Sequence, residues 1–169
     1  LTIKNNNLIV ATQGRSLWII DDLTLLHQLN NTTKNKNEIL YKPKESYRMG
    51  GRSSKNSKTE GTNHSGGVMK YFYLKNFDAA KDTVSLTYLN VKNDTIKSFS
   101  TDSKEEKDTL EIEKGANMVT WNMRGKGAEK LDGMILWWAN LDGPKAVPGT
   151  YKVSLAVNEK EVSNQSFII

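Results

Sequence analysis

The sequence predicts an all-β protein built as an antiparallel β-sandwich, and three observations support this prediction. In residues 150–157 every second residue is apolar, and residues 117–123 show the same pattern around Trp121. A period of two with one apolar face indicates a half-buried strand. Pro148 and Gly149 predict a turn before the first of these segments, because proline presets φ and glycine accepts positive φ.

Further strand-like segments extend this pattern from about residue 66 to the C-terminus. They are short runs rich in β-branched and aromatic residues, separated by polar turns: residues 68–74, 84–91, 95–100, 110–112, 117–123, 150–157 and 167–169. About seven short strands at this spacing are typical of an immunoglobulin-like or fibronectin type III-like sandwich. We therefore assign residues 66–169 to one sandwich domain.

The N-terminal residues predict a β-hairpin. Two apolar runs, residues 8–11 and 17–20, lie on either side of a turn at Gln13 and Gly14. Both runs are nearly continuous, so both faces of the hairpin need to be covered. Because an isolated hairpin is only marginally stable in water, we expect it to pack on the sandwich, on a partner chain or on another part of a longer protein. Its free edge also allows a homodimer.

The segment between the hairpin and the sandwich predicts a short helix followed by a linker. Asp22 is a suitable N-cap for a helix over residues 23–29. Residues 34–60 hold eight basic and three acidic residues, and 8 − 3 = +5 equals the formal net charge of the whole chain. Since this stretch is polar and without periodicity, we interpret it as a solvated linker, mobile over residues 44–65, and not as a nucleic-acid-binding patch.

Composition excludes several kinds of chemistry. The chain has no cysteine, so disulfides, thiolate catalysis and cysteine-ligated zinc are excluded. With only two histidines, His27 and His64, a histidine-rich metal site is excluded, and no pair of carboxylates has a spacing that indicates hydrolysis. We predict no cofactor, no catalytic residue and no membrane span. The chain starts at Leu1 without a basic and apolar leader, so we expect an excised fragment or a processed product.

Four residues are the candidate ligand-binding residues. Trp121 and Arg124 could stack on and clamp a sugar or a peptide, but Trp121 has the strand position of a core residue and Arg124 that of a turn residue. Trp137 and Trp138 are neighbours on an expected short strand, so their rings should face opposite ways, one buried and one nearer the solvent. The exposed ring is the best candidate for carbohydrate stacking, but packing against the N-terminal hairpin or against another domain of a longer protein is the interpretation that we favour.

Two parts of the chain resemble a known family. Residues 11–29 (ATQGRSLWIIDDLTLLHQL) look like the end of the last propeller blade in large bacterial proteins with BNR-type (Asp-box) repeats, usually labelled glycosyl hydrolase or sortilin-like. The C-terminal module of those proteins resembles four later segments of this chain, in the same order and spacing: GVMKYFYL (67–74), NMVTWNMR (117–124), GMILWW (133–138) and GPKAVPGTYKVSL (143–155).

The resemblance implies a domain organisation and a context. Residues 1–22 would be the remnant hairpin of a β-propeller blade, residues 23–65 the short helix and basic linker, and residues 66–169 the immunoglobulin-like sandwich. The expected function is that of a non-catalytic C-terminal accessory domain in a secreted, periplasmic or cell-surface protein. It would pack against its own upstream propeller or mediate protein contacts. A carbohydrate-binding module is one alternative, and a fragment of a glycosidase whose active site lies in the propeller is another.

Overall fold

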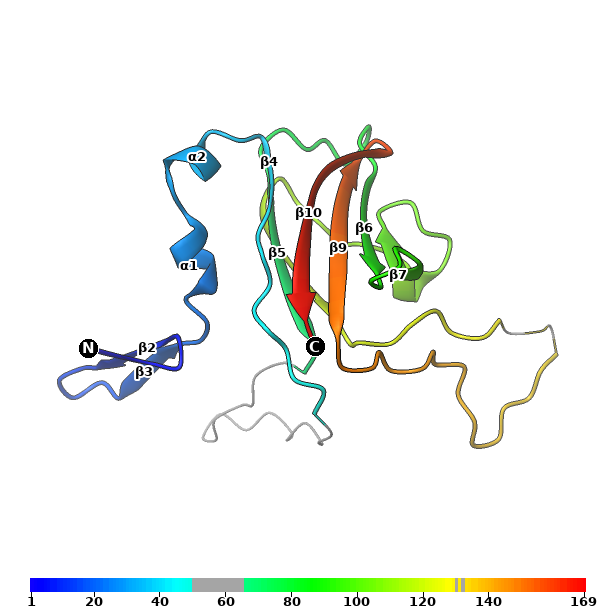
Figure 1. The fold of residues 1–169 in the computed structure, drawn as a ribbon, viewed down its shortest axis with the longest axis horizontal. Helices are drawn as coiled ribbons and strands as arrows, with labels where there is room; N and C mark the ends of the chain where they lie inside the picture. The colour runs from blue at the N-terminus through cyan, green and yellow to red at the C-terminus, as the bar shows by residue number, and fades with distance from the viewer. Residues whose placement is uncertain (50–65, 130, 132) are drawn as a thin grey trace.

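The computed structural model describes residues 1–49, 66–129, 131 and 133–169. These residues form three antiparallel sheets, accompanied by two short α-helices and one 3-10 turn (Figure 1). The predicted all-β sandwich is confirmed.

The N-terminal sheet consists of the first three strands, in the order β1-β2-β3. Their bounds are Thr2–Lys4 (β1), Asn7–Ala11 (β2) and Leu17–Ile20 (β3). The predicted hairpin is confirmed, since β2 and β3 pair antiparallel with Leu8 opposite Ile20. β1 joins this hairpin through a turn in which Asn5 and Asn6 have φ of 50° and 63°. Asparagine tolerates this left-handed conformation better than most residues.

Two short helices follow, α1 (Thr24–Gln28) and α2 (Asn31–Lys34). The predicted helix over residues 23–29 is confirmed as α1, but its N-cap is Leu23, not Asp22. Asp22 nevertheless supports the first turn, because its Oδ1 accepts the backbone N–H of Thr24 at 3.0 Å. Asp22 therefore acts as a capping acceptor from one position before the N-cap.

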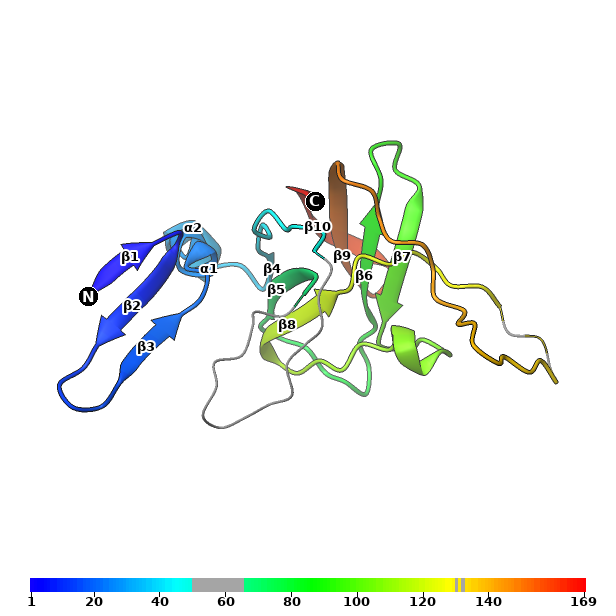
Figure 2. The ribbon, with the colours of Figure 1, turned by 90° about the horizontal axis from the view of Figure 1, so that it is seen from below.

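The sandwich contains seven strands in two sheets, which Figure 2 shows as separate layers. One sheet has the order β4-β5-β8, from Glu38–Leu40, Val68–Leu74 and Gly115–Trp121. The other has the order β10-β9-β6-β7, from Lys160–Ile168, Thr150–Val157, Val84–Leu89 and Thr95–Ser100. The 3-10 turn η1 (Glu106–Asp108) lies between β7 and β8.

Strand β4 comes from the range 23–65, so this range supplies part of the sandwich. Leu40 lies opposite Phe72 of β5 and is buried in the core. After β4, the backbone N–H of Ser46 donates to the carbonyl of Ile168 at 3.1 Å, which holds this segment beside β10. The expected mobility of residues 44–65 and much of the basic stretch fall on residues 50–65, which lie outside the described residues.

Aromatic residues from both sheets meet in the core between the layers. Trp121 has no exposed surface and stacks on Tyr88 with 4.4 Å between ring centroids and 29° between ring planes. Phe167 and Tyr151 pack edge-on against Trp121. The prediction that Trp121 is a core residue is confirmed. Such aromatic packing stabilises the domain beyond simple burial of area.

Tyr151 also fixes the start of β9. Its hydroxyl donates to the carbonyl of Val147 at 2.6 Å, the arrangement known as a tyrosine corner in immunoglobulin-like sandwiches. Gly149 and Ile169 exchange two backbone hydrogen bonds of 2.9 and 3.0 Å. The predicted turn before residue 150 is therefore tied to both the core and the C-terminal residue.

Candidate functional site

The connection between β8 and β9 is unusually long for such a sandwich. Residues 122–149 run from one sheet to the other, and their described residues form no strand. Long connections of this kind in compact domains are often functional. We call residues 125–145 the tryptophan loop; residues 130 and 132 within it are not among the described residues. The loop extends away from the sandwich in Figure 1.

Backbone hydrogen bonds close the base of the tryptophan loop into a narrow stem. Gly125 N–H donates to the carbonyl of Pro144 at 2.9 Å, and Ala128 N–H donates to that of Leu141 at 3.0 Å. Glycine is required on both sides. A Cβ on Gly127 would overlap the carbonyl oxygen of Leu141, and one on Gly143 would overlap that of Gly125. The two backbones therefore approach more closely than any side chain would allow.

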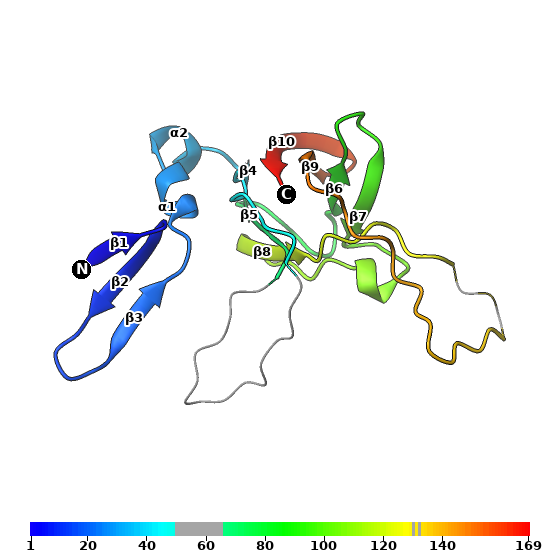
Figure 3. The same ribbon diagram turned by 60° about the horizontal axis from the view of Figure 1, so that its bottom comes forward.

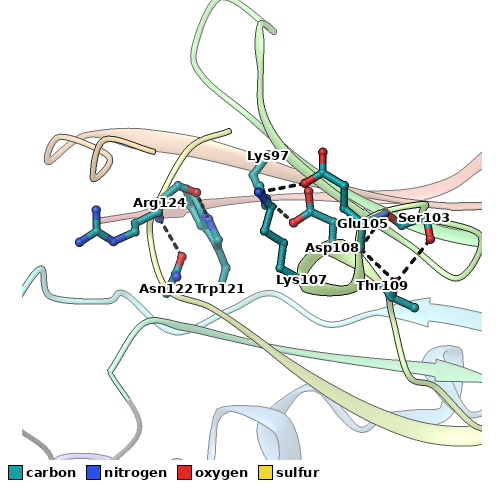
Figure 4. Close-up of polar contacts among 9 residues, drawn as sticks. All are labelled: Lys97, Ser103, Glu105, Lys107, Asp108, Thr109, Trp121, Asn122 and Arg124. Atoms are coloured by element: carbon teal, nitrogen blue, oxygen red, sulfur yellow. Dashed lines mark hydrogen bonds and ion pairs between the residues drawn. The ribbon is translucent and has the colours of Figure 1, made fainter. Parts of the chain in front are cut away.

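Arg124 and Trp121 hold this stem to the sandwich, and Figure 4 shows the contacts of Arg124 with Trp121 and Asn122. The Arg124 guanidinium donates to the carbonyl of Gly143 at 2.9 Å, and the Trp121 indole N–H donates to the carbonyl of Arg124 at 2.7 Å. The predicted turn is confirmed, since Asn122 Oδ1 accepts the N–H of Arg124 at 3.0 Å. Both candidate residues make structural contacts at the base of the loop. The buried ring of Trp121 offers no surface for a ligand.

Trp137 and Trp138 lie within the tryptophan loop, and the expectation that they share a strand with one ring buried was wrong. They are not on a strand, and neither is buried: their exposed fractions are 85% and 98%. Ile135 and Leu131 of the same loop are also mostly exposed. The physical reason is that the loop extends away from both sheets, where no strand of the described residues pairs with it (Figure 1). Rings of neighbouring residues face opposite sides only when the backbone is a strand.

A cleft of about 610 Å³ lies between the base of the loop and the N-terminal sheet. Its charged lining mixes both signs, with Asp21, Asp22, Lys44, Glu45, Arg48, Arg124 and Lys145. Arg48 of this lining also contacts the connection before β9, because its guanidinium donates to the carbonyl of Ala146 at 3.5 Å. Asp22 also influences a neighbour: burial, and to a smaller degree the charge of Asp22, raises the pKa of Tyr71.

A second group of charged residues borders the stem from the side of η1. Lys97 forms a largely buried ion pair with Asp108, and Lys107 pairs with Glu105 at 2.9 Å (Figure 4). The Lys107 partner lowers the pKa of Glu105. Lys107 and Asp108 share a smaller hollow with Lys126 and the stem residue Gly127. These pairs are consistent with a structural role, since each acid has a basic neighbour.

Lys70 is the one basic group of the described residues whose pKa is strongly shifted, and no sequence pattern indicates a function for it. It shares the inner face of β5 with Val68 and Phe72 and has no exposed surface. Its ammonium donates to the carbonyl of Tyr41, and burial lowers its pKa to about 7. A lysine near neutrality is suited to catalysis only if a substrate can reach it. Lys70 is closed off by the core.

The described part of the chain offers little else for chemistry. It contains no cluster of three or more His, Asp or Glu side chains that could hold a metal ion. None of its helices has the length and the apolar character that crossing a bilayer requires. Comparisons with protein-family models, with curated proteins and with solved structures find no match. The site must therefore be interpreted from its own geometry.

Proposed function

We propose that this chain is a non-catalytic accessory domain of a secreted, periplasmic or cell-surface protein, and that it packs on a β-propeller of the same polypeptide through its N-terminal sheet. One observation carries the proposal. All four residues of β3 are exposed, with exposed fractions from 51% to 69%, although all four are large and apolar. A strand that is apolar on both faces belongs in the interior of stacked sheets.

The shape of this sheet indicates what kind of partner would cover it. Side chains of successive residues in β3 point to opposite faces, so Trp18 and Ile19 need contacts on different sides. Pairing the β3 edges of two copies would give hydrogen-bond partners to the backbone groups of the edge strand. It would leave both faces of the sheet in water. Stacking two copies would cover one face only. A partner with a sheet on each side, such as adjoining propeller blades, covers both faces, and this agrees with the family resemblance of residues 11–29.

The proposal is tested by producing the upstream propeller region and this chain separately and titrating one with the other by calorimetry. We expect binding with a negative heat-capacity change, because apolar surface is buried. Ile19→Asp should abolish binding, and Val91→Ser should not; Val91 is an equally exposed apolar residue in the turn between β6 and β7. Absence of binding by the unaltered chain, or full binding by Ile19→Asp, would reject the proposal. Sedimentation of this chain alone tests the homodimer.

A carbohydrate-binding module is the second candidate, because Trp137 and Trp138 both present open ring faces. Titration with oligosaccharides tests it. Either no binding, or binding that is unchanged in Trp137→Ala and Trp138→Ala, would reject it. A glycosidase whose active site lies in the propeller is tested by assaying the full-length protein beside this chain. Activity of this chain alone would overturn its assignment as non-catalytic.

A further inference from the structure

The end of the tryptophan loop has the composition of a binding hot spot. Residues 133–141 carry no charge, and they include Trp137, Trp138 and Ile135 with most of their side chains in water. Contiguous exposed apolar surface is uncommon on a protein that has no partner. Tryptophan is also enriched among the residues that dominate binding energy in protein interfaces.

The stem fixes the two backbones at the base of this apolar end. Gly127 and Gly143 allow the two backbones to lie against each other, and Arg124 bonds the stem to the sandwich. A loop that is ordered before binding loses less conformational entropy when it docks. The base of the loop is therefore suited to presenting the two indole rings to a partner.

The tryptophan loop and the N-terminal sheet reach beyond the same end of the sandwich. Figures 1 and 3 both show the sheet on one side and the loop on the other, extending past the lower end of the two layers. The cleft of about 610 Å³ lies between them, because Asn7 of β2 and Asp22, which follows β3, line it together with Arg124 and Lys145 from the base of the loop. Among the described residues, the cleft thus lies between the N-terminal sheet and the base of the tryptophan loop.

We propose that the tryptophan loop is a second anchor on the same protein that covers the N-terminal sheet. This inference rests on the proposed function and adds a contact to it: Trp137 and Trp138 insert into an apolar cleft of the propeller partner. The charged side chains of the cleft between the two anchors face polar groups of that partner. Two separated anchors fix the orientation of the domain, which a three-stranded sheet alone would leave free to pivot.

The charges around the loop favour a protein over a lipid surface. Lys126 and Lys145 lie near its base, but so do Glu129 and Asp142, and Lys126 contacts Glu129 at 3.7 Å. Loops that insert into anionic membranes are surrounded by basic residues without such acids. Mixed charge around an apolar centre is instead the usual composition of a protein interface, with an apolar core and a polar rim.

The test uses the same titration against the upstream propeller region. Trp137→Ser with Trp138→Ser should weaken binding on the order of 30-fold or more in Kd, the effect of losing a hot-spot residue. Val91→Ser is the matched control and should bind as the unaltered chain does. The thermal midpoint of the double variant should stay the same, since the side chains that it alters are exposed.

The possible outcomes separate the two proposals. If the unaltered chain does not bind the propeller region, both the proposed function and this inference are rejected. If it binds, and the double variant binds equally well, the sheet is the only anchor and this inference alone is rejected. Vesicles of phosphatidylcholine with phosphatidylglycerol, and a set of oligosaccharides, are titrated in parallel. Loss of vesicle or sugar binding in the double variant, with propeller binding intact, would reassign the loop to that ligand.

Discussion

Replacing the buried Lys70 by methionine should remove a pH dependence from the stability of the sandwich. Lys70 lies between Val68 and Phe72 on the inner face of β5, and its ammonium bonds only to the carbonyl of Tyr41 among the described residues. Burial lowers its pKa to about 7 from 10.5. Methionine has a similar length and no charge, so it keeps most of the apolar contacts of the lysine stem.

The sign follows from proton binding in the two states. Between pH 7 and pH 10.5 the unfolded chain holds a proton on Lys70 that the folded chain has released. Unfolding therefore takes up a proton in this window, and the free energy of unfolding rises with pH. For a single group, the free energy of unfolding can rise by at most about 1.4 kcal/mol per pH unit. Its total rise from pH 7 to pH 9 is roughly 2 kcal/mol. Below pH 7 both states are charged and the contribution is constant.

The measurement is urea unfolding at pH 7, 8 and 9, followed by tryptophan fluorescence. The unaltered chain should become more stable across this range, and Lys70→Met should show a much smaller change. Lys160→Met is the matched control, because Lys160 is an exposed lysine in β10, and it should keep the full slope. The range stops at pH 9 because burial raises the pKa of Tyr88, which destabilises the fold once free tyrosine ionises. An equal slope in Lys70→Met would refute the reasoning.

Three further substitutions test the core and the loop. Tyr88→Phe should raise the free energy of unfolding by about 1 kcal/mol, because the buried Tyr88 hydroxyl makes no hydrogen bond to the described residues; a clear loss in urea unfolding would contradict this. Tyr151→Phe should lower it by about 1 kcal/mol by removing the bond to Val147, and an unchanged midpoint would count against a stabilising tyrosine corner. Gly143→Ala should open the stem and speed proteolysis within the tryptophan loop. Gly66→Ala, whose Cβ would contact nothing, should leave that cleavage rate unchanged.

The sandwich could be predicted because its strands are buried on one face only. In β9 the alternation from Tyr151 to Leu155 indicates which side chains point to the other sheet. Shifting the register of this strand by one residue would expose all of them. The same strict period placed Lys70 on the inner face of β5 with Val68. What the pattern does not state is that a lysine at that position loses all contact with water, because this depends on how closely the second sheet covers it.

The tryptophan loop could not be predicted, since an apolar run does not specify its neighbours. Ile135 and Leu136 followed by two tryptophans have the composition of a buried strand. A strand, however, also needs a backbone beside it, and the stem holds these residues away from both sheets. The available signal was the pair of glycines at 127 and 143 on either side of the run. This pair of glycines predicts a stem only when the two residues are known to lie on facing sides of the loop.

The proposed role follows from a contrast within the molecule. The sandwich closes its own core with Trp121, Tyr88 and Phe167, and none of these contacts involves β3 or the end of the tryptophan loop. The apolar side chains outside the sandwich are therefore not left over from an incomplete core. The stem that holds the loop, by contrast, depends on two glycines and on Arg124. A fold that fixes the base of an exposed apolar loop in this way, while its core is already complete, is best explained by a partner that binds the loop.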